Sequence, residues 1–404
     1  MAELKPPVET FARIKVIGVG GSGGNAIGRM IDSKLKGVEF VAINTDAQDL
    51  HHNRASEKVH IGKNLTKGLG AGMNPDVGRQ AAEENRDEMQ EVLKGTDMVF
   101  VTCGLGGGTG SGAAPIVAEA AKESGALTVA VVTKPFSFEG AQRKAIADEA
   151  LENLRERVDT LITIPNDKLL QIIDKKTTLV NSFKIVDDVL RQGVQGISDL
   201  ITKPGIVNVD FADVRAIMAN SGSSLMGIGV GAGENRAAEA AKAAINSPLL
   251  ELSIDGAKGV LFNVSGSTDL TMLEINEAAN IITESIDPNA KVIFGAVVDE
   301  AIKKGEVQIT VVATGFDIEE NRETLLEKMS RASRVEEKQN EIAIKKEDTS
   351  KMTYPSQEST MIIEEKVPPK QNRPESNLGR AEKVDEDDDD DLEIPTFIRR
   401  KMGK

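Results

Sequence analysis

The sequence predicts an α/β fold: a Rossmann-like parallel sheet, a long central helix, and a second α+β domain with a four-stranded sheet. Three observations predict it. Apolar runs alternate with helical segments over the first half of the chain, two of these runs end in glycine-rich loops, and the pattern changes after Pro204 and Gly205. Because strands buried on both faces are apolar at nearly every position, such runs are typical of a parallel sheet covered by helices.

The elements follow one another at short spacing. Apolar runs predict strands beginning at residue 14 and lying at 38–46, 98–104, 127–136 and 160–167. Helices are predicted between them at 25–34, 113–125 and 141–158. Apolar residues spaced by threes and fours predict a longer helix at 177–201. After the break, strands at 225–231, 259–266, 291–299 and 307–316 enclose helices at 234–245 and 271–285.

The composition divides the chain further. Residues 317–404 contain 23 acidic and 17 basic residues, and all but two of the 37 glycines precede them. Such a charged, glycine-poor stretch is typical of a disordered linker. We therefore predict an extension at 1–11, a first domain at 12–176, a central helix and following loop at 177–221, a second domain at 222–316, a linker at 317–391 and a terminal peptide at 392–404.

Composition also excludes several classes of protein. Cys103 is the only cysteine, so neither an intrachain disulfide framework nor a multi-cysteine zinc site can form, and the residue fits a buried strand end. The opening residues lack an apolar signal core and no run reaches about 18 apolar residues, which predicts a cytoplasmic protein without a membrane span. The net charge of −15 argues against a nucleic-acid partner. His51, His52 and His60 fit a surface loop better than a metal site.

The first glycine loop has five glycines between residues 18 and 24. As G-x-G-x-x-G between a strand and a helix it fits a dinucleotide fingerprint, with Asp46 at the end of the next strand as the ribose ligand. As G-x-S-x-G around Ser22 it fits a nucleophile elbow, but all three histidines lie within 40 residues of that serine, too close for the usual triad order. In each case, glycine lets backbone N–H groups approach an anion at a helix N-terminus.

A second loop, GLGGGTGSG at 104–112, again follows a strand and precedes a helix. Two such loops on one sheet suit a polyphosphate held from two sides, whereas a dehydrogenase with a single fingerprint has no use for the second. The sequence has no G-x-x-x-x-G-K-[ST], so no P-loop lysine neutralises the phosphates. Backbone amides, helix dipoles and Mg²⁺ remain for that task.

The stretch GGGTGSG at 106–112 is similar to the signature loop of the tubulin/FtsZ family. The resemblance spans about residues 12–316 and continues through 44–50, 68–82, 134–140, 164–170, 208–214 and, in the tail, 392–400. Ser22 departs from it, since the family often has glycine there. The resemblance implies the tubulin/FtsZ fold and a cytoskeletal GTPase that binds GTP or GDP with Mg²⁺, polymerises head to tail and forms the division ring at mid-cell.

The resemblance also implies roles for individual residues. The phosphates would be held by Gly21, Ser22, Gly23, Gly24, Asn25, Gly107, Gly108, Thr109 and Gly110, with Ala71, Gly72 and Asn74 closing over the terminal phosphate. The same nucleotide-binding set includes Asn44 and Asp46. Glu139 and Arg143 would face the ribose, and Asn166, Phe183 and Asp187 would hold the base. A carboxylate at 187 also agrees with the chemistry, because it accepts the adjacent N–H groups of guanine, which adenine lacks.

Asn208, Asp210 and Asp213 form a polar cluster after the central helix. The aspartates are spaced i, i+3, so both fit one face at a helix start, where an aspartate by itself is typical of a cap. The resemblance implies that this loop enters the nucleotide site of the next subunit, where its acids position the attacking water. Hydrolysis would then require two subunits.

The terminal peptide LEIPTFIRR at 392–400 follows a run of acids at 385–391. An apolar segment with a basic end on a charged tether is typical of a peptide that folds on binding. It resembles the C-terminal peptide of the family, which implies membrane-anchoring adaptors such as the actin-like FtsA as partners, besides division inhibitors. Two alternatives stay open: an NAD-dependent oxidoreductase built on the first loop, and a nucleotide-binding scaffold that does not hydrolyse.

Overall fold

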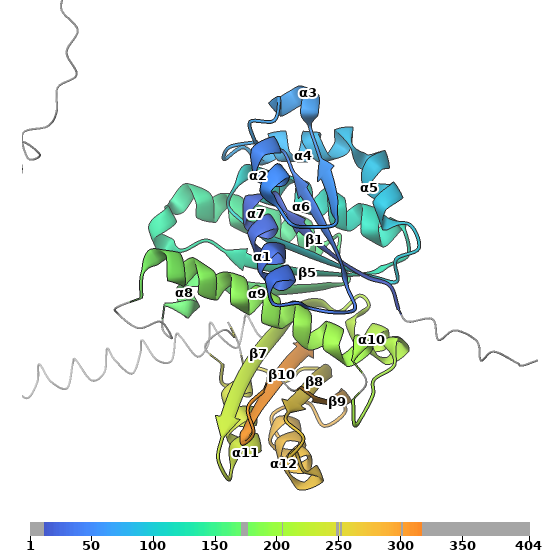
Figure 1. Ribbon diagram of the computed structural model, residues 1–404, viewed down its shortest axis with the longest axis vertical. Coiled ribbons are helices and arrows are strands. Elements are labelled where there is room, and N and C mark those ends of the chain that lie inside the picture. Colours follow the sequence, from blue (N-terminus) through green and yellow to red (C-terminus); the bar gives the residue numbers. More distant parts are fainter. Residues whose placement is uncertain are drawn as a thin grey trace, which may run out of the picture. The chain divides into compact units, whose positions relative to one another are not determined.

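The computed structural model describes residues 12–170, 177–203, 205–247, 250, 253–299 and 302–316. The predictions for the N-terminal extension, the linker and the terminal peptide lie outside these residues. Figure 1 shows how the described elements are arranged. Among the described residues, none of the helices combines the length and the apolar character that crossing a bilayer requires.

Within the described residues, the strands are hydrogen-bonded in the order β3-β2-β1-β4-β5-β6-β7-β10-β8-β9. They are β1 (Ile14–Val19), β2 (Glu39–Asn44), β3 (Glu57–His60), β4 (Met98–Gly104), β5 (Leu127–Lys134), β6 (Thr160–Pro165), β7 (Gly222–Ala232), β8 (Gly259–Gly266), β9 (Lys291–Val298) and β10 (Glu306–Thr314). The strands from β3 to β7 pair in parallel, whereas β10 pairs antiparallel with β7 and β8. This confirms the predicted parallel sheet and the second, four-stranded one.

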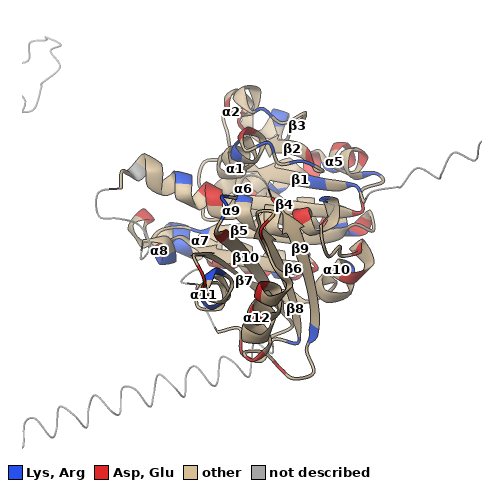
Figure 2. Cartoon of the chain, turned by 60° about the horizontal axis from the view of Figure 1, so that its bottom comes forward, with Lys and Arg blue, Asp and Glu red and all other residues tan. Residues whose placement is uncertain are grey.

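Helices cover both faces of the parallel strands. They are α1 (Gly20–Asp32), α2 (Ala47–His52), α3 (Lys63–Thr66), α4 (Pro75–Glu84), α5 (Arg86–Leu93), α6 (Gly108–Glu123), the 3₁₀ turn η1 (Ser137–Glu139), α7 (Ala141–Arg155), α8 (Asn166–Leu169), α9 (Leu179–Thr202), α10 (Phe211–Met218), α11 (Arg236–Ile245) and α12 (Met272–Thr283). Consecutive residues of β1 show the two layers: Val16 packs in the core under α1 and α9, and Ile17 packs in the core under α4 to α7. Acidic and basic residues are interspersed over the helices (Figure 2).

The elements between residues 47 and 93 were not predicted. They are the helices α2 to α5 and the edge strand β3. α3 and β3 have four residues each, and Val59 is the buried residue of β3. These two are too short to develop a recognisable apolar period. α4 has ten residues, but its buried residues are Gly78, Ala81 and Ala82, which are too small to mark an apolar face in the sequence.

Strand β7 joins the two parts of the sheet. Its first residues pair in parallel with the start of β6, and from Leu225 onward it pairs antiparallel with β10. Helix α11 lies directly on this strand, where Gly227, Gly229 and Gly231 face it. A Cβ atom on any of the three would come within 2.0 Å of an α11 carbonyl oxygen. Part of the glycine surplus therefore permits close packing in the second domain and is unrelated to phosphate binding.

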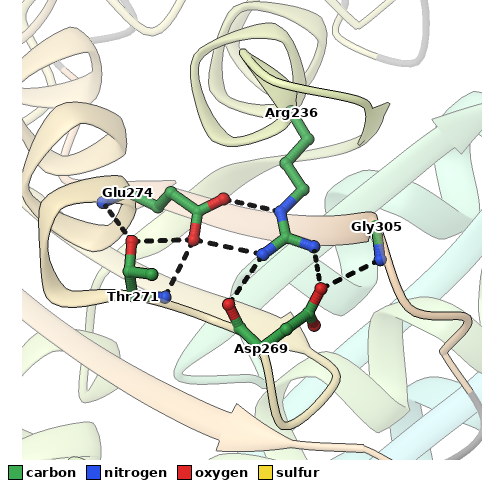
Figure 3. A network of polar contacts seen from close by, with 5 residues as sticks. All are labelled: Arg236, Asp269, Thr271, Glu274 and Gly305. Atoms are coloured by element: carbon green, nitrogen blue, oxygen red, sulfur yellow. Dashed lines mark hydrogen bonds and ion pairs between the residues drawn. The ribbon is translucent and has the colours of Figure 1, made fainter.

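A buried ion network fixes the start of α11 (Figure 3). Arg236 is 5% exposed, and it donates to Glu274 at 2.6 and 3.2 Å and to Asp269 at 2.7 Å. Glu274 also accepts from the backbone N–H and the hydroxyl of Thr271, at 2.8 and 2.9 Å. Asp269 accepts from the N–H of Gly305 at 3.1 Å. The guanidinium hydrogen bonds hold the pKa of both carboxyl groups below their ordinary values.

We expect Arg236→Met to lower the free energy of unfolding at neutral pH by more than the surface control below, because it leaves the Glu274 carboxylate, whose side chain is 17% exposed, without its counter-charge. Denaturant titration measures this change. Arg79→Met is the matched control, since Arg79 also bridges two carboxylates, Asp76 and Glu83, but at the surface. There the expected loss is within about 1 kcal/mol.

The stability difference between wild type and Arg236→Met should also depend on pH. Because the folded-state pKa of Glu274 is depressed, the network stabilises the fold above the ordinary pKa range of a glutamate, and this contribution is lost as the pH falls through the folded-state value. The stability difference between wild type and Arg236→Met should therefore shrink in acid. A difference of constant size across the acid range would contradict a charge-based role for the network.

Candidate functional site

The site lies where the order of the parallel strands reverses. β1 has β2 on one side and β4 on the other. The helix that follows β1, α1, packs on one face of the sheet, and the helix that follows β4, α6, packs on the other face. In open parallel sheets, ligands bind at such a reversal, outside the carboxyl ends of the strands. Both glycine loops stand at this point, since they follow β1 and β4.

The first loop turns directly from β1 into α1. Gly20 has φ of +71°, in the left-handed region that favours glycine. A Cβ atom on Gly18 would lie 2.4 Å from the carbonyl oxygen of Gly23, and one on Gly23 would lie 2.5 Å from that of Thr102 in β4. The backbone at the start of α1 thus touches the neighbouring strand, and no other residue type fits these positions without displacing it.

The second loop places the start of α6 beside the first. The N–H of Gly104 donates to Ser22 Oγ at 2.8 Å, so a hydrogen bond joins the two loops. The N–H of Gly108 donates to the carbonyl of Gly72 at 2.8 Å, which ties the 71–74 loop to α6. The N–H groups of Gly107, Thr109 and Gly110 have no helical acceptor, because they stand at the beginning of the helix. These backbone donors and the positive end of the helix dipole can hold an anion.

A cavity of ≈ 350 Å³ opens between the loops. The predicted residues that line it are Gly21, Ser22, Gly72, Gly107, Gly108, Thr109, Gly110, Glu139, Arg143, Asn166, Phe183 and Asp187. A neighbouring cavity of ≈ 540 Å³ shares Phe183 and Asp187 with it and adds Gly24 and Asn25. The structure therefore brings most of the predicted nucleotide-binding residues to one place.

One end of the cavity is lined by Asn166, Phe183 and Asp187. Asn166 is 5% exposed, and its Oδ1 has no hydrogen-bond partner among the described residues. The ring of Phe183 packs edge-on against Phe136 at a centroid distance of 5.7 Å and leaves 42% of the residue exposed. Asp187 is ion-paired with Arg29 of α1 at 2.8 Å. Burial raises the pKa of the Asp187 carboxyl, and the Arg29 guanidinium opposes this shift.

Glu139 and Arg143 also line the cavity of ≈ 350 Å³. Their side chains are ion-paired at 2.8 Å, one turn apart. Glu139 also accepts from the backbone N–H of Phe136 at 2.9 Å. The carboxylate is thus oriented before any ligand arrives.

Other predicted residues support the site without lining either cavity. Gly23, within the first loop, packs against Gly18 and the carbonyl of Thr102, and the carbonyl of Ala71 packs against Gly108. Asn44 donates to Asp49 at 2.6 Å. Asp46 and Asn74 cap α2 and α4, where they accept backbone N–H groups at 2.9 and 3.0 Å.

Sequence reasoning missed four side chains at the site. Thr45 is fully buried and shares a hydrogen bond of 2.7 Å with Thr109. Asn53 donates to the carbonyl of Gly24 at 2.9 Å. Asp49 lies beside the first loop, and its pKa is raised by burial and by Asp46. Arg29 is the fourth. Each acts through a contact distant in sequence or with a loop, so no local pattern indicates it.

The acidic cluster lies elsewhere. Asp210 and Asp213 are exposed at the start of α10, and the side chain of Asp210 makes no capping hydrogen bond there. The other end of α10 is fixed to the amino ends of the strands, because Thr160 at the start of β6 donates to the carbonyl of Met218 at 2.6 Å. The glycine loops occupy the carboxyl ends. Within one chain, the acids therefore lie toward the amino ends of the parallel strands, whereas the glycine loops lie at their carboxyl ends.

The remaining reactive residues do not form a site. Cys103 is fully buried, as predicted, and burial raises the pKa of its thiol to about 12. His51 and His52 are exposed at the end of α2, and His60 is half-buried in β3. Across the described ranges, no three His, Cys, Asp or Glu side chains are grouped so that they could hold a metal ion.

Comparisons with known proteins agree with this architecture. A model of the tubulin/FtsZ family GTPase domain matches residues 13–174, and a model of the FtsZ family C-terminal domain matches residues 222–317. The chain is similar to an empty FtsZ dimer from M. jannaschii, with 49% identity and a TM-score of 0.74, over 77% of this chain and 90% of that one. For a mutant of the same protein the values are 50%, 0.73, 76% and 92%.

A more distant likeness extends to CetZ2 from Haloferax volcanii, solved as a protofilament bound to GTPγS. It has 21% identity and a TM-score of 0.65, over 80% of this chain and 99% of that one, and it supports the fold alone. The two family models lie on either side of α9, and the FtsZ structures cover both parts. The resemblance noted in the glycine loops is thereby confirmed, and the chain belongs to the tubulin/FtsZ family.

Proposed function

We propose that this protein is a GTPase that assembles head to tail into filaments and hydrolyses GTP between subunits, at the bacterial division ring. The observation that carries the proposal is the position of the acids. Asp210 and Asp213 are exposed toward the amino ends of the parallel strands, and the glycine loops lie at the carboxyl ends of these strands. Between them runs α9, whose 24 residues span about 36 Å. A second copy stacked in the same orientation would bring the acids of one subunit to the phosphate loops of the next.

The cavity fits a guanine nucleotide. The phosphates would lie over the first turns of α1 and α6, where the backbone donors and helix dipoles compensate their charge. The ribose would face Glu139 and Arg143. The base would stack on Phe183, and its N–H groups would donate to Asp187 and to the unpaired Oδ1 of Asn166. Adenine lacks the pair of adjacent donors, so the acceptor sites of the half-buried Asp187 carboxylate that Arg29 does not occupy would stay without a partner.

Mg²⁺ would arrive with the nucleotide. This ion usually keeps several waters and binds through phosphate oxygens plus one or two side chains. Asp49 supplies a carboxylate beside the first loop, with Oδ2 3.5 Å from where a Cβ atom of Gly21 would stand. A cation there would favour its charged form, against the effect of burial. The ion would neutralise phosphate charge that the missing P-loop lysine leaves uncompensated.

Exposed apolar side chains lie near both parts of the proposed shared site, the glycine loops of one subunit and the acids of the next. Leu69, just before the 71–74 loop, is 84% exposed, and Met73 within that loop is 39% exposed. Ile206 is 59% exposed beside Asn208. Contact between such unlike patches is heterologous, and between subunits stacked in the same orientation it continues into an open filament. The acidic net charge would make this assembly sensitive to salt.

The oxidoreductase alternative has less support. It needs Asp46 as a ribose ligand, but the Asp46 carboxylate caps α2 and lines neither cavity. It also leaves the second glycine loop without a role. The non-hydrolysing scaffold fits the same cavity and differs only in the use of the acids, so activity measurements must separate it.

We further propose that residues 392–400 recruit membrane-anchoring adaptors such as FtsA, and that division inhibitors act on the same protein. The peptide lies outside the described residues. Its support is the sequence pattern, an apolar segment between an acidic run and a basic end.

Adding GTP and Mg²⁺ to the full-length protein should raise right-angle light scattering and release phosphate. The two signals should appear together, because hydrolysis needs the subunit contact. An oxidoreductase would give neither signal, and a scaffold would give scattering without phosphate release.

Asp213→Ala should bind GTP and assemble like wild type but release phosphate at least about 100-fold more slowly, the loss typical of a positioned acid or base. Asp87→Ala is the matched control, since Asp87 is an exposed acid in the first turn of α5 as Asp213 is in that of α10. It should keep wild-type turnover. Wild-type turnover in Asp213→Ala would refute the shared site.

Deleting residues 392–404 should abolish adaptor binding and leave GTPase activity unchanged, because the peptide takes no part in the proposed nucleotide site. Co-sedimentation of filaments with purified FtsA measures the first effect, and phosphate release the second. Adaptor binding that survives the deletion would refute the assignment of this peptide.

A further inference from the structure

Arg29 lines the wider cavity, of ≈ 540 Å³, beside Asp187. Neither the sequence analysis nor the proposed function gives this cation a role. It stands in the last turn of α1, and its Nε donates to Asp187 Oδ2 at 2.8 Å. The two residues are 158 positions apart in sequence, on helices that pack side by side (Figure 1). The Asp187 side chain is 16% exposed and that of Arg29 is 36% exposed. This ion pair is therefore formed at the rim of the site, partly out of water.

The contact leaves Asp187 able to bind a second partner. A carboxylate has about four lone-pair sites, and the Nε hydrogen bond occupies one of them. Asp187 lines both cavities, one turn after Phe183 on the same face of α9. A base stacked on Phe183 would present its edge to the carboxylate, and the single contact from Arg29 would limit which way that carboxylate turns.

Other charged groups face the same space. On the α1 and α2 side, the wider cavity is lined by Asp32, Asp49, His52 and Arg54 as well as Arg29, and Lys184 lines it from α9. Glu139 and Arg143 line the narrower cavity. Several of these are already paired: Arg54 with Asp32, and Arg143 with Glu139. Arg29 is the group whose hydrogen bond and charge oppose the effect of burial on Asp187.

We propose that Arg29 is a positioning residue for base selection: it orients the Asp187 carboxylate toward the N1–H and 2-amino donors of guanine and keeps it charged. The inference rests on the proposed GTP binding and adds to it a residue for which the resemblance implied no role. Arg29 does not touch the reacting phosphates, so it acts on which nucleotide binds and not on the hydrolysis step.

The physical reason is the balance of effects on Asp187. Burial disfavours the charged carboxylate, and Arg29 favours it. Guanine needs the charged form, because a protonated carboxyl has lost part of its acceptor capacity and carries a donor of its own. Without Arg29 the pKa of Asp187 would rise further. Guanine binding would then be lost at a higher pH than in wild type as the solution is acidified.

The test measures GDP and IDP dissociation constants of the full-length protein by calorimetry. IDP keeps the N1–H of guanine but lacks the 2-amino group, and diphosphates avoid turnover. Arg29→Gln should weaken GDP about tenfold and IDP less, because GDP donates two hydrogen bonds to the Asp187 carboxylate and IDP only one, so that the preference for GDP narrows. Arg29→Lys should recover part of the preference. GDP affinity of Arg29→Gln should also fall on acidification at a higher pH than that of wild type.

Arg191→Gln is the matched control. Arg191 lies on α9 and, like Arg29, is ion-paired with an aspartate, Asp188, at 2.7 Å, but it lines neither of the two nucleotide cavities. Its GDP to IDP ratio should stay at the wild-type value. If Arg29 were only a strut between helices, Arg29→Gln would weaken both ligands equally and leave the ratio unchanged, and this result would overturn the inference.

Tighter GDP binding in Arg29→Gln would also overturn it, since Arg29 would then be a competitor that the nucleotide must displace. A wild-type protein that binds neither diphosphate would instead refute the proposed function itself. The two failures are thus distinguishable.

Discussion

The backbone contact between the two glycine loops is the constraint on which the rest of the site depends. A Cβ atom on Gly20 would lie 3.1 Å from the backbone nitrogen of Gly110, and one on Gly110 would lie 3.7 Å from the carbonyl oxygen of Val19. Because these backbones touch, α1 and α6 begin beside each other and direct two helix N-termini into one cavity. In the proposed GTPase, fixed dipoles and backbone donors would neutralise the phosphates, and these groups need no side chain to be ordered when the ligand binds.

Helix α9 connects the cavity to the loop that carries the acids, near the amino ends of the parallel strands. Phe183 and Asp187 line the cavities near its beginning, and Lys203 at its C-cap is ion-paired with Asp199 and Asp299, at 2.8 and 3.0 Å. A nucleotide that contacts the start of this helix is thus linked through one rigid element to the loop that leads to the acids. In the proposed filament, the same helix would connect the nucleotide site of a subunit to the one that it completes in its neighbour.

The sequence predicted the fold in outline because its signals are local. Apolar strands, a long apolar period at 177–201 and two glycine loops each indicate an element and its neighbour. The elements between residues 47 and 93 gave no such signal. The sequence also could not distinguish the glycines of β7 that pack on α11 from the glycines of the two loops. For the site, resemblance supplied most lining residues. Arg29, Thr45 and Asn53 were missed, because their contacts arise only when distant segments meet.

The division of one site between two subunits is the central claim, and mixing two inactive variants tests it most directly. Asp213→Ala keeps the phosphate loops, whereas Gly108→Ala keeps the acids but places a Cβ within 2.7 Å of the Gly72 carbonyl oxygen. If the site is shared, each variant alone should release little phosphate. An equal mixture should then regain activity, up to about one contact in four, since random head-to-tail stacking joins intact loops to intact acids at that frequency. A mixture no more active than its separate components, although both variants enter the same filaments, would contradict the account.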